Sequence, residues 1–181
     1  MELHEAFIAA TIDAIEANKK LADKAIAQLS DQQLRTALDP NTNSIAVIMK
    51  HVAGNLLSRW TDFLTSDGEK PNRNRDDEFV DTFANRQQIV DRWEQGFACF
   101  LNTIRGLSAD DLEKSIAIRG VPHTVPLAIQ RSLGHTCYHL GQIVQAARVL
   151  AGENWTTLTI ARGQSQQFNQ ANWGTTGKSH S

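Results

Sequence analysis

The segment Gly134–Gln142, GHTCYHLGQ, places two histidines four residues apart in an apolar stretch with helical spacing. At about 100° per residue, His135 and His139 lie about 40° apart on a helix, and Gln142 lies beside them. Two imidazoles one turn apart can point at a single spot, as metal ligands do. The stretch therefore predicts a helix that carries a polar seam with two metal ligands. The apolar face next to this seam contains Ile129, Leu133, Leu140, Val144 and Ala147.

Amphipathic patterns of the same kind occupy three further parts of the chain. Apolar residues recur at helical spacing over about residues 3–29, 44–64 and 81–107. The fourth pattern starts near Pro126, which suits a first helical turn, and stops at Gly152. Alternating residues around Gly120 predict a small β-hairpin before the fourth helix. These elements predict an all-α fold, a four-helix bundle with one small hairpin.

A chain of 181 residues fits one domain. We expect the bundle and a packed C-terminal segment to occupy residues 1–168, and a flexible tail to occupy 169–181. We also expect residues 157–168 to fold over one end of the bundle and narrow the access to the metal, with Arg162 or Gln164 near the pocket rim. The alternative is that this segment merely covers apolar surface.

A metal with two histidine ligands needs a further ligand, and His51 on the second helix is the best candidate. It lies on a polar seam with Asn55, beside an apolar face, as the pair on the fourth helix does. The alternative is that these histidines are hydrogen-bonded residues of the core. Arg59 falls on the inward arc of the same helix and could hold a carboxylate, or it could pair with an acidic residue near the helix end. Asn55 and Gln142 are expected to support the ligands or line a pocket.

The composition excludes some classes of partner. The net charge is −2 and no long basic block occurs, so we expect no nucleic-acid partner. No run of about 18 apolar residues is present, so we expect no membrane span. The N-terminal residues lack the features of a secretory signal, and two helix-borne cysteines fit a reduced, cytoplasmic protein. The third helix carries more large apolar side chains, among them Trp93, Phe97 and Phe100, than one seam of a bundle needs. We therefore expect a homodimer built from helix faces.

Two motifs carry a resemblance to a known family. The block GNLLSRWTDFLTSDGEK after His51 and the segment HTCYHLGQI around the other pair resemble the DinB-like (YfiT-like) superfamily of metal-binding four-helix bundles. The match is closer to an uncharacterised branch that ends in a tail similar to RGQSQQFN. The resemblance implies a divalent metal bound by His51, His135 and His139. It also implies a possible role for a low-molecular-weight thiol, since some relatives are transferases or isomerases that use bacillithiol, mycothiol or glutathione.

Three neutral imidazoles suit zinc or nickel, and iron less selectively. They leave coordination positions open, whereas structural zinc sites are usually closed by four protein ligands. We therefore expect a metal-dependent enzyme that acts on a small molecule, foremost a thiol-dependent S-transferase, with a hydrolase-like activity as another form. The alternatives are a non-catalytic metal-binding stress-response bundle and a dimerising bundle whose metal is incidental.

Overall fold

The computed structural model describes residues 2–173, and four long helices dominate them. These helices are α1 (Leu3–Ile26), α3 (Ile45–Trp60), α4 (Arg86–Arg105) and α6 (Val125–Ala151). The shorter helices are α2 (Asp31–Arg35), η1 (Asp77–Phe79), α5 (Ala109–Leu112), η2 (Gly152–Asn154) and α7 (Ser165–Trp173). A single antiparallel hairpin pairs β1 (Ser115–Ile118) with β2 (Val121–Thr124). The predicted all-α bundle with a small hairpin before the last long helix is confirmed.

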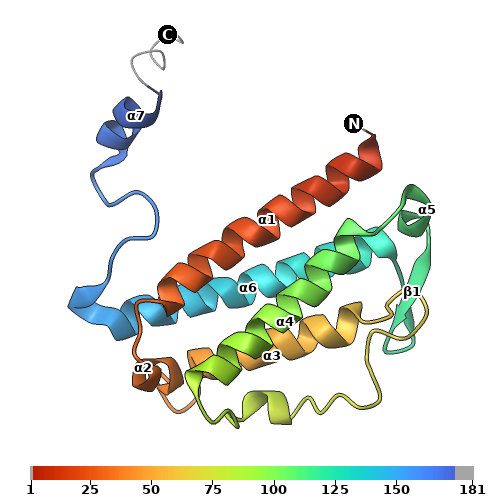
Figure 1. The fold of residues 1–181 in the computed structure, drawn as a ribbon, viewed down its shortest axis with the longest axis horizontal. Helices are drawn as coiled ribbons and strands as arrows, with labels where there is room; N and C mark the ends of the chain where they lie inside the picture. Colours follow the sequence, from red (N-terminus) through yellow and green to blue (C-terminus); the bar gives the residue numbers. More distant parts are fainter. Residues whose placement is uncertain (1, 174–181) are drawn as a thin grey trace.

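The four long helices form a closed ring of neighbours. α1 packs on α6, α6 on α3, α3 on α4, and α4 on α1. Figure 1 shows that the chain runs back along the bundle between α3 and α4, so these two neighbours are parallel. This crossover, residues 61–85, contains η1 and passes alongside α3. The order of the bundle is therefore not a simple alternation of up and down helices.

The core contains the large side chains that the helical periodicity places inward. Trp93, Phe97 and Phe100 of α4 are each 1% exposed, and Trp60 of α3 packs edge-on against Phe100. Burying one such ring stabilises the fold by about 1.5–3 kcal/mol. Because these rings lie inside the chain, they do not form the apolar surface on which the homodimer was expected. Self-association stays a prediction.

Several helix ends differ from those predicted, and local hydrogen bonds explain the differences. α3 ends at Trp60 because Thr61 is extended and Asp62 has a φ of 48°. α4 begins only at Arg86, since the side chain of Asn85 accepts a hydrogen bond from the backbone of Gln88 and caps the helix. The segment after α1 was predicted to be a loop, but it contains the short α2, which a reciprocal capping box between Ser30 and Gln33 starts.

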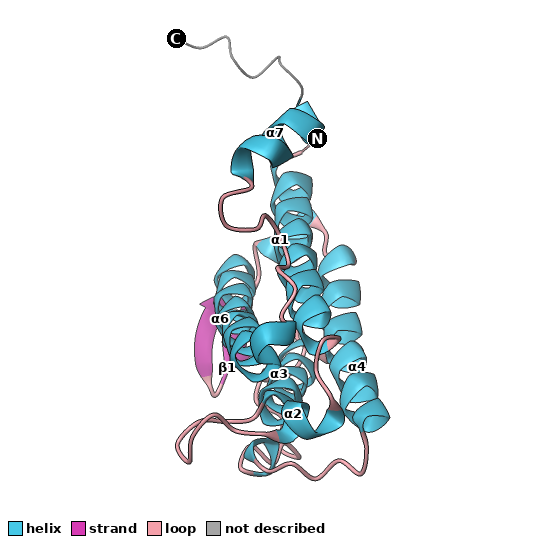
Figure 2. Ribbon diagram, turned by 90° about the vertical axis from the view of Figure 1, so that its left-hand side faces the viewer, coloured by secondary structure: helices cyan, strands magenta, loops and turns pink. Residues whose placement is uncertain are grey.

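The C-terminal segment follows the bundle only at its beginning. The backbone N–H and C=O of Thr156 bond to the side chain of Gln28, and Leu158 is partly buried against the core. Residues 159–172 are exposed, and α7 stands away from the bundle in Figures 1 and 2. Within residues 157–168, which were expected to fold over the bundle, Leu158 is the residue that packs partly against the core. The expected tail from 169 includes the end of α7, and residues 174–181 lie outside the described residues.

No helix among residues 2–173 is long and apolar enough to cross a membrane. The longest helix, α6, mixes its apolar face with histidine, glutamine and arginine.

The parallel helices α3 and α4 are in tight contact at Gly96. A Cβ built on this glycine would lie 2.7 Å from Cα and 3.0 Å from Cβ of Ala53 on α3. Backbone atoms of a packed helix cannot move aside cheaply, so a side chain here would push α3 and α4 apart. By contrast, nothing lies within 4 Å of a Cβ built on Gly141, which is on the exposed face of α6.

We expect Gly96→Ala to lower the free energy of unfolding by about 1–3 kcal/mol through overpacking. Gly141→Ala is the matched control, because it makes the same change in a helix with open space around it. It should raise the free energy of unfolding by about 0.5–1 kcal/mol, because glycine destabilises the interior of a helix by that amount relative to alanine. Urea denaturation followed by circular dichroism measures both. Equal effects in the two variants would show that the contact at Gly96 is not tight.

Candidate metal centre

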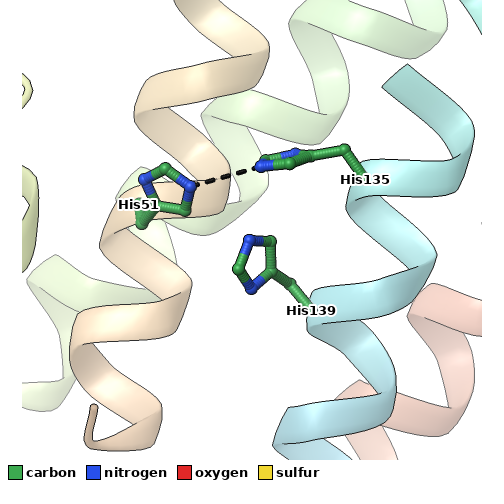
Figure 3. Close-up of side chains that lie close together, drawn as sticks. All are labelled: His51, His135 and His139. Carbon is green, nitrogen blue, oxygen red and sulfur yellow. Dashed lines mark hydrogen bonds between the residues drawn. The ribbon is translucent and has the colours of Figure 1, made fainter. Parts of the chain in front are cut away.

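Three histidines converge between α3 and α6. His51 lies near the middle of α3, and His135 and His139 lie one turn apart on α6 (Figure 3). The Nε2 atoms of His51 and His135 are 3.3 Å apart, and one ligand nitrogen from each of the three rings lies within 4.8 Å of the others. The ring centroids are 4.6–5.3 Å apart. The structure therefore brings together the three predicted ligands in a cluster that could hold a metal ion.

The environment of the cluster keeps the two imidazoles of α6 neutral. Burial, with the nearby His139 and His51, lowers the pKa of His135 to about 4. Burial also lowers the pKa of His139, although the hydrogen bond that His139 donates to Gln142 opposes this shift. A histidine must be neutral to bind a metal, because protonation removes the lone pair that forms the bond. Near pH 7 both rings of α6 are therefore in the form that a divalent cation requires.

Hydrogen bonds fix which nitrogen of two rings carries the proton. His51 donates from Nδ1 to Oε2 of Glu78 over 2.9 Å, and His139 donates from Nδ1 to Oε1 of Gln142 over 2.7 Å. Each bond leaves the Nε2 lone pair free on the side that faces the cluster. Nδ1 of His135 is buried and has no hydrogen-bond partner among the described residues, so packing orients this ring. This donor set fits a divalent cation bound through Nε2.

Glu78 supports the cluster, although its position in the sequence did not single it out. It is 6% exposed and lies in η1 on the crossover. Arg73 binds it through two hydrogen bonds of 2.8 Å, from Nε and from one terminal nitrogen. Burial raises the pKa of Glu78, but the hydrogen bonds and charges of Arg73 and His51 outweigh that effect, so its pKa is lowered. Glu78 is thus an anion that orients the ring of His51.

The mid-helix glycine of α3 makes room for this carboxylate. A Cβ built on Gly54 would lie 2.8 Å from Cδ of Glu78. Gly54 is one turn from His51, so the crossover can approach α3 at the level of the histidines. A glycine within a strongly helical pattern, three residues after a ligand histidine, was the one signal in the sequence for this close approach.

The other predicted site residues lie at different distances from the cluster. Asn55 and Arg59 line a cavity of about 150 Å³ that opens next to His51 and His135. Gln142 lies on the other side of the cluster, where it binds His139. Arg162 is exposed in the C-terminal segment and is not part of the cavity wall. Among residues 2–173, the group of possible ligands contains the three histidines and no fourth side chain.

We expect the purified chain to bind one divalent ion, and His135→Ala and His139→Ala each to lose most of it, because two imidazoles hold a metal much more weakly than three. Elemental analysis of untagged protein after gel filtration measures the stoichiometry. His4→Ala, on α1, is the control and should keep the ion. Full occupancy in both α6 variants would contradict the assignment.

Glu78→Gln should weaken metal binding by about 10- to 100-fold, since it removes the charge that orients His51. Competition with a chromophoric chelator measures the affinity. Asp76→Asn removes the same charge from an exposed site on the same crossover, and its affinity should equal that of the parent chain. If the two variants bind equally well, Glu78 has no role in holding the ligand.

Comparisons with known proteins give one match. Neither the curated proteins nor the solved structures contain a significant match to this chain. A family model described as a protein of unknown function, DUF1572, matches residues 2–164. The match includes the four long helices, the crossover and the hairpin, and therefore all three histidines of the cluster. The chain belongs to the DUF1572 family.

Proposed function

We propose that this protein is a metal-dependent enzyme that acts on a small molecule, and that it catalyses transfer to or from a low-molecular-weight thiol. One observation carries the proposal. The ligand nitrogens of three imidazoles converge on one spot, no fourth protein ligand joins them among the described residues, and two of the rings border a cavity. An incomplete ligand set beside a cavity is typical of catalytic sites, whereas structural zinc sites are usually closed.

A divalent ion at this cluster would lower the pKa of a water or thiol that binds at its open positions. Zinc, nickel and iron all accept imidazole ligands, and the three histidines do not choose among them. The chain's own residues hold this arrangement. Glu78 and Gln142 fix the tautomers of two ligand rings, and the stacking of Phe79 on His51, with a centroid distance of 4.8 Å, covers the side of the cluster that faces the crossover.

The cavity can receive a substrate next to the ligands. Trp60, Phe63 and Ile116 form an apolar part of its wall, and they reduce the water around a bound molecule. The indole N–H of Trp60 donates to Ser132 over 3.0 Å, so this ring has a fixed position. A small organic body can therefore pack against the wall while its reactive end faces the histidines.

The sulfur nucleophile must come from outside the chain. Cys99 and Cys137 are both free, and neither lines the cavity. Burial raises the pKa of Cys137, which disfavours its thiolate. A thiol cosubstrate would supply the missing group: its thiolate attacks an electrophilic carbon, a carbon–sulfur bond forms, and the leaving group departs with its electron pair. The thiol proton passes to water.

The three-histidine arrangement also supports our inference that this family is a branch of the DinB-like superfamily. The observation behind it is the placement of one ligand on α3 and two on α6, together with the four-helix bundle. This matches the resemblance seen in the motifs around His51 and His135.

The test uses the protein loaded with cobalt(II), whose spectrum reports its ligands. Adding a small thiol such as glutathione or cysteine should produce sulfur-to-cobalt charge-transfer absorption, and His139→Ala should abolish it. The zinc- and nickel-loaded proteins should then accelerate consumption of the thiol by an added electrophile. A bound ion with no spectral change on addition of any thiol would refute the thiol-dependent function and favour a non-catalytic metal site.

A further inference from the structure

The cavity beside the histidine cluster is lined by many arginines. Five guanidinium groups line one cavity of about 150 Å³, which is unusual in a chain of net charge −2. They come from α3, the crossover, the hairpin turn and α6, which are distant in the sequence. These residues are Arg59, Arg73, Arg75, Arg119 and Arg131.

Two of the five are nearly buried and paired with carboxylates. Arg59 and Arg73 have side chains only 11% and 5% exposed, and both form salt bridges with Glu69. Arg73 also binds Glu78 and so belongs to the support of His51. Glu69 and Glu78 are the carboxylates that pair with this group of arginines, and the carboxylate of Asp67 also interacts with Arg59. Three anions thus face five cations. The cavity therefore keeps an excess of positive charge.

Two arginines have no carboxylate partner among the described residues. Arg75 is exposed, and its side chain makes no hydrogen bond or ion pair there. Arg131 donates to Nε2 of the buried His123 over 2.9 Å. His123 in turn donates from Nδ1 to the carbonyl of Val121 over 2.9 Å, which fixes Nε2 as the acceptor. The guanidinium of Arg131 is thus held in place without a carboxylate, so no negative charge offsets its own at the cavity.

Arg119 occupies a backbone position that disfavours its own side chain. It has a φ of 55° and Gly120 has a φ of 71°, so both residues of the hairpin turn are left-handed. Turns of this kind prefer asparagine or glycine, and an arginine there is strained. Both carboxylate oxygens of Asp67 accept a backbone N–H of this turn, from Arg119 over 2.8 Å and from Gly120 over 2.7 Å. Such strain is often found where a side chain serves a ligand.

The side chain of Arg119 is half exposed at 49%, with one hydrogen bond to Glu69 over 2.9 Å. It therefore lies at the rim, and its remaining donors are available to a ligand. A guanidinium presents several N–H groups in one plane, a geometry that matches carboxylate and phosphate oxygens. Anion recognition explains both the unpaired charge and the unfavourable turn residue.

We propose that this cavity binds the anionic group, a carboxylate or a phosphate, of a small molecule, and that Arg75, Arg119 and Arg131 hold it. The proposal deepens the proposed function, on which it rests for the role of that molecule as a substrate. The anionic end lies among the arginines, the body packs on the apolar wall, and the other end faces His51 and His135. Arg59 and Arg73 shape the site and contribute to its field.

The test measures binding of inorganic phosphate and of malonate by isothermal titration calorimetry at constant ionic strength. Phosphate represents the phosphate group and malonate the carboxylate group. The full chain is used in metal-loaded and chelator-treated forms. We expect saturable binding of at least one anion in both forms. In Arg119→Asn and in Arg131→Gln the dissociation constant should be about tenfold larger, because each variant loses one charge-assisted contact. The anion that binds more tightly identifies the chemical group.

Arg148→Gln is the matched control, because it removes the same charge from an exposed position of α6 outside the cavity. Its anion affinity should equal that of the parent chain. Arg119→Asn should also keep or raise the thermal midpoint, since asparagine tolerates the left-handed backbone. Loss of stability with unchanged anion binding would show a merely structural Arg119 and overturn the proposal. Absence of saturable binding, or equal binding in all variants, would overturn it as well.

The two proposals can fail separately. Anion binding to the chelator-treated protein does not depend on a metal, so it tests the arginine cavity alone. The thiol-dependent cobalt spectrum depends on the histidine cluster and tests the proposed function. A chain that binds anions but shows no thiol-dependent spectrum keeps the cavity proposal and loses the S-transfer function.

Discussion

The hydrogen bond from His51 to Glu78 joins the crossover to the bundle at the level of the histidine cluster. Both partners are buried, and a buried carboxylate is costly unless charged donors compensate it. Arg73 provides this compensation through two hydrogen bonds, and Gly54 provides the space. The pair sets the tautomer of His51, the path of residues 61–85 and the position of two arginines of the cavity. Glu78 therefore connects the fold to the site.

The sequence predicts the parts of this protein that depend on local periodicity. The spacing of apolar residues was enough to find α1, α3, α4 and α6, and the spacing of two histidines was enough to place them on one face of α6. The partnership with His51 followed from a similar polar seam on another helix. These predictions work because an α-helix turns by a constant angle per residue. The position of a residue in the sequence therefore determines the side of the helix on which its side chain lies.

Glu78 and Arg119 could not be found in this way. Glu78 lies in an aperiodic segment, as the last of three consecutive acidic residues that follow Arg73 and Arg75. Its contact with His51 spans 27 residues and depends on how the crossover returns along α3. Arg119 enters the cavity because the hairpin folds over it, and Gly120 predicted the turn without showing where it points. The ends of α3 and α4 were misplaced for a related reason, since capping bonds decide them and apolar spacing does not.

The ring of helices also sets the order in which a growing chain can fold. α1 packs mainly on α6, and roughly 100 residues lie between them. At about 5–20 residues per second, the apolar face of α1 waits on the order of 5–20 s for its partner during synthesis. A contact so distant in sequence also slows folding, because a long loop must close first. The nascent chain is therefore most exposed to aggregation and chaperone binding at its N-terminal helix, until the helix that carries His135 and His139 has emerged.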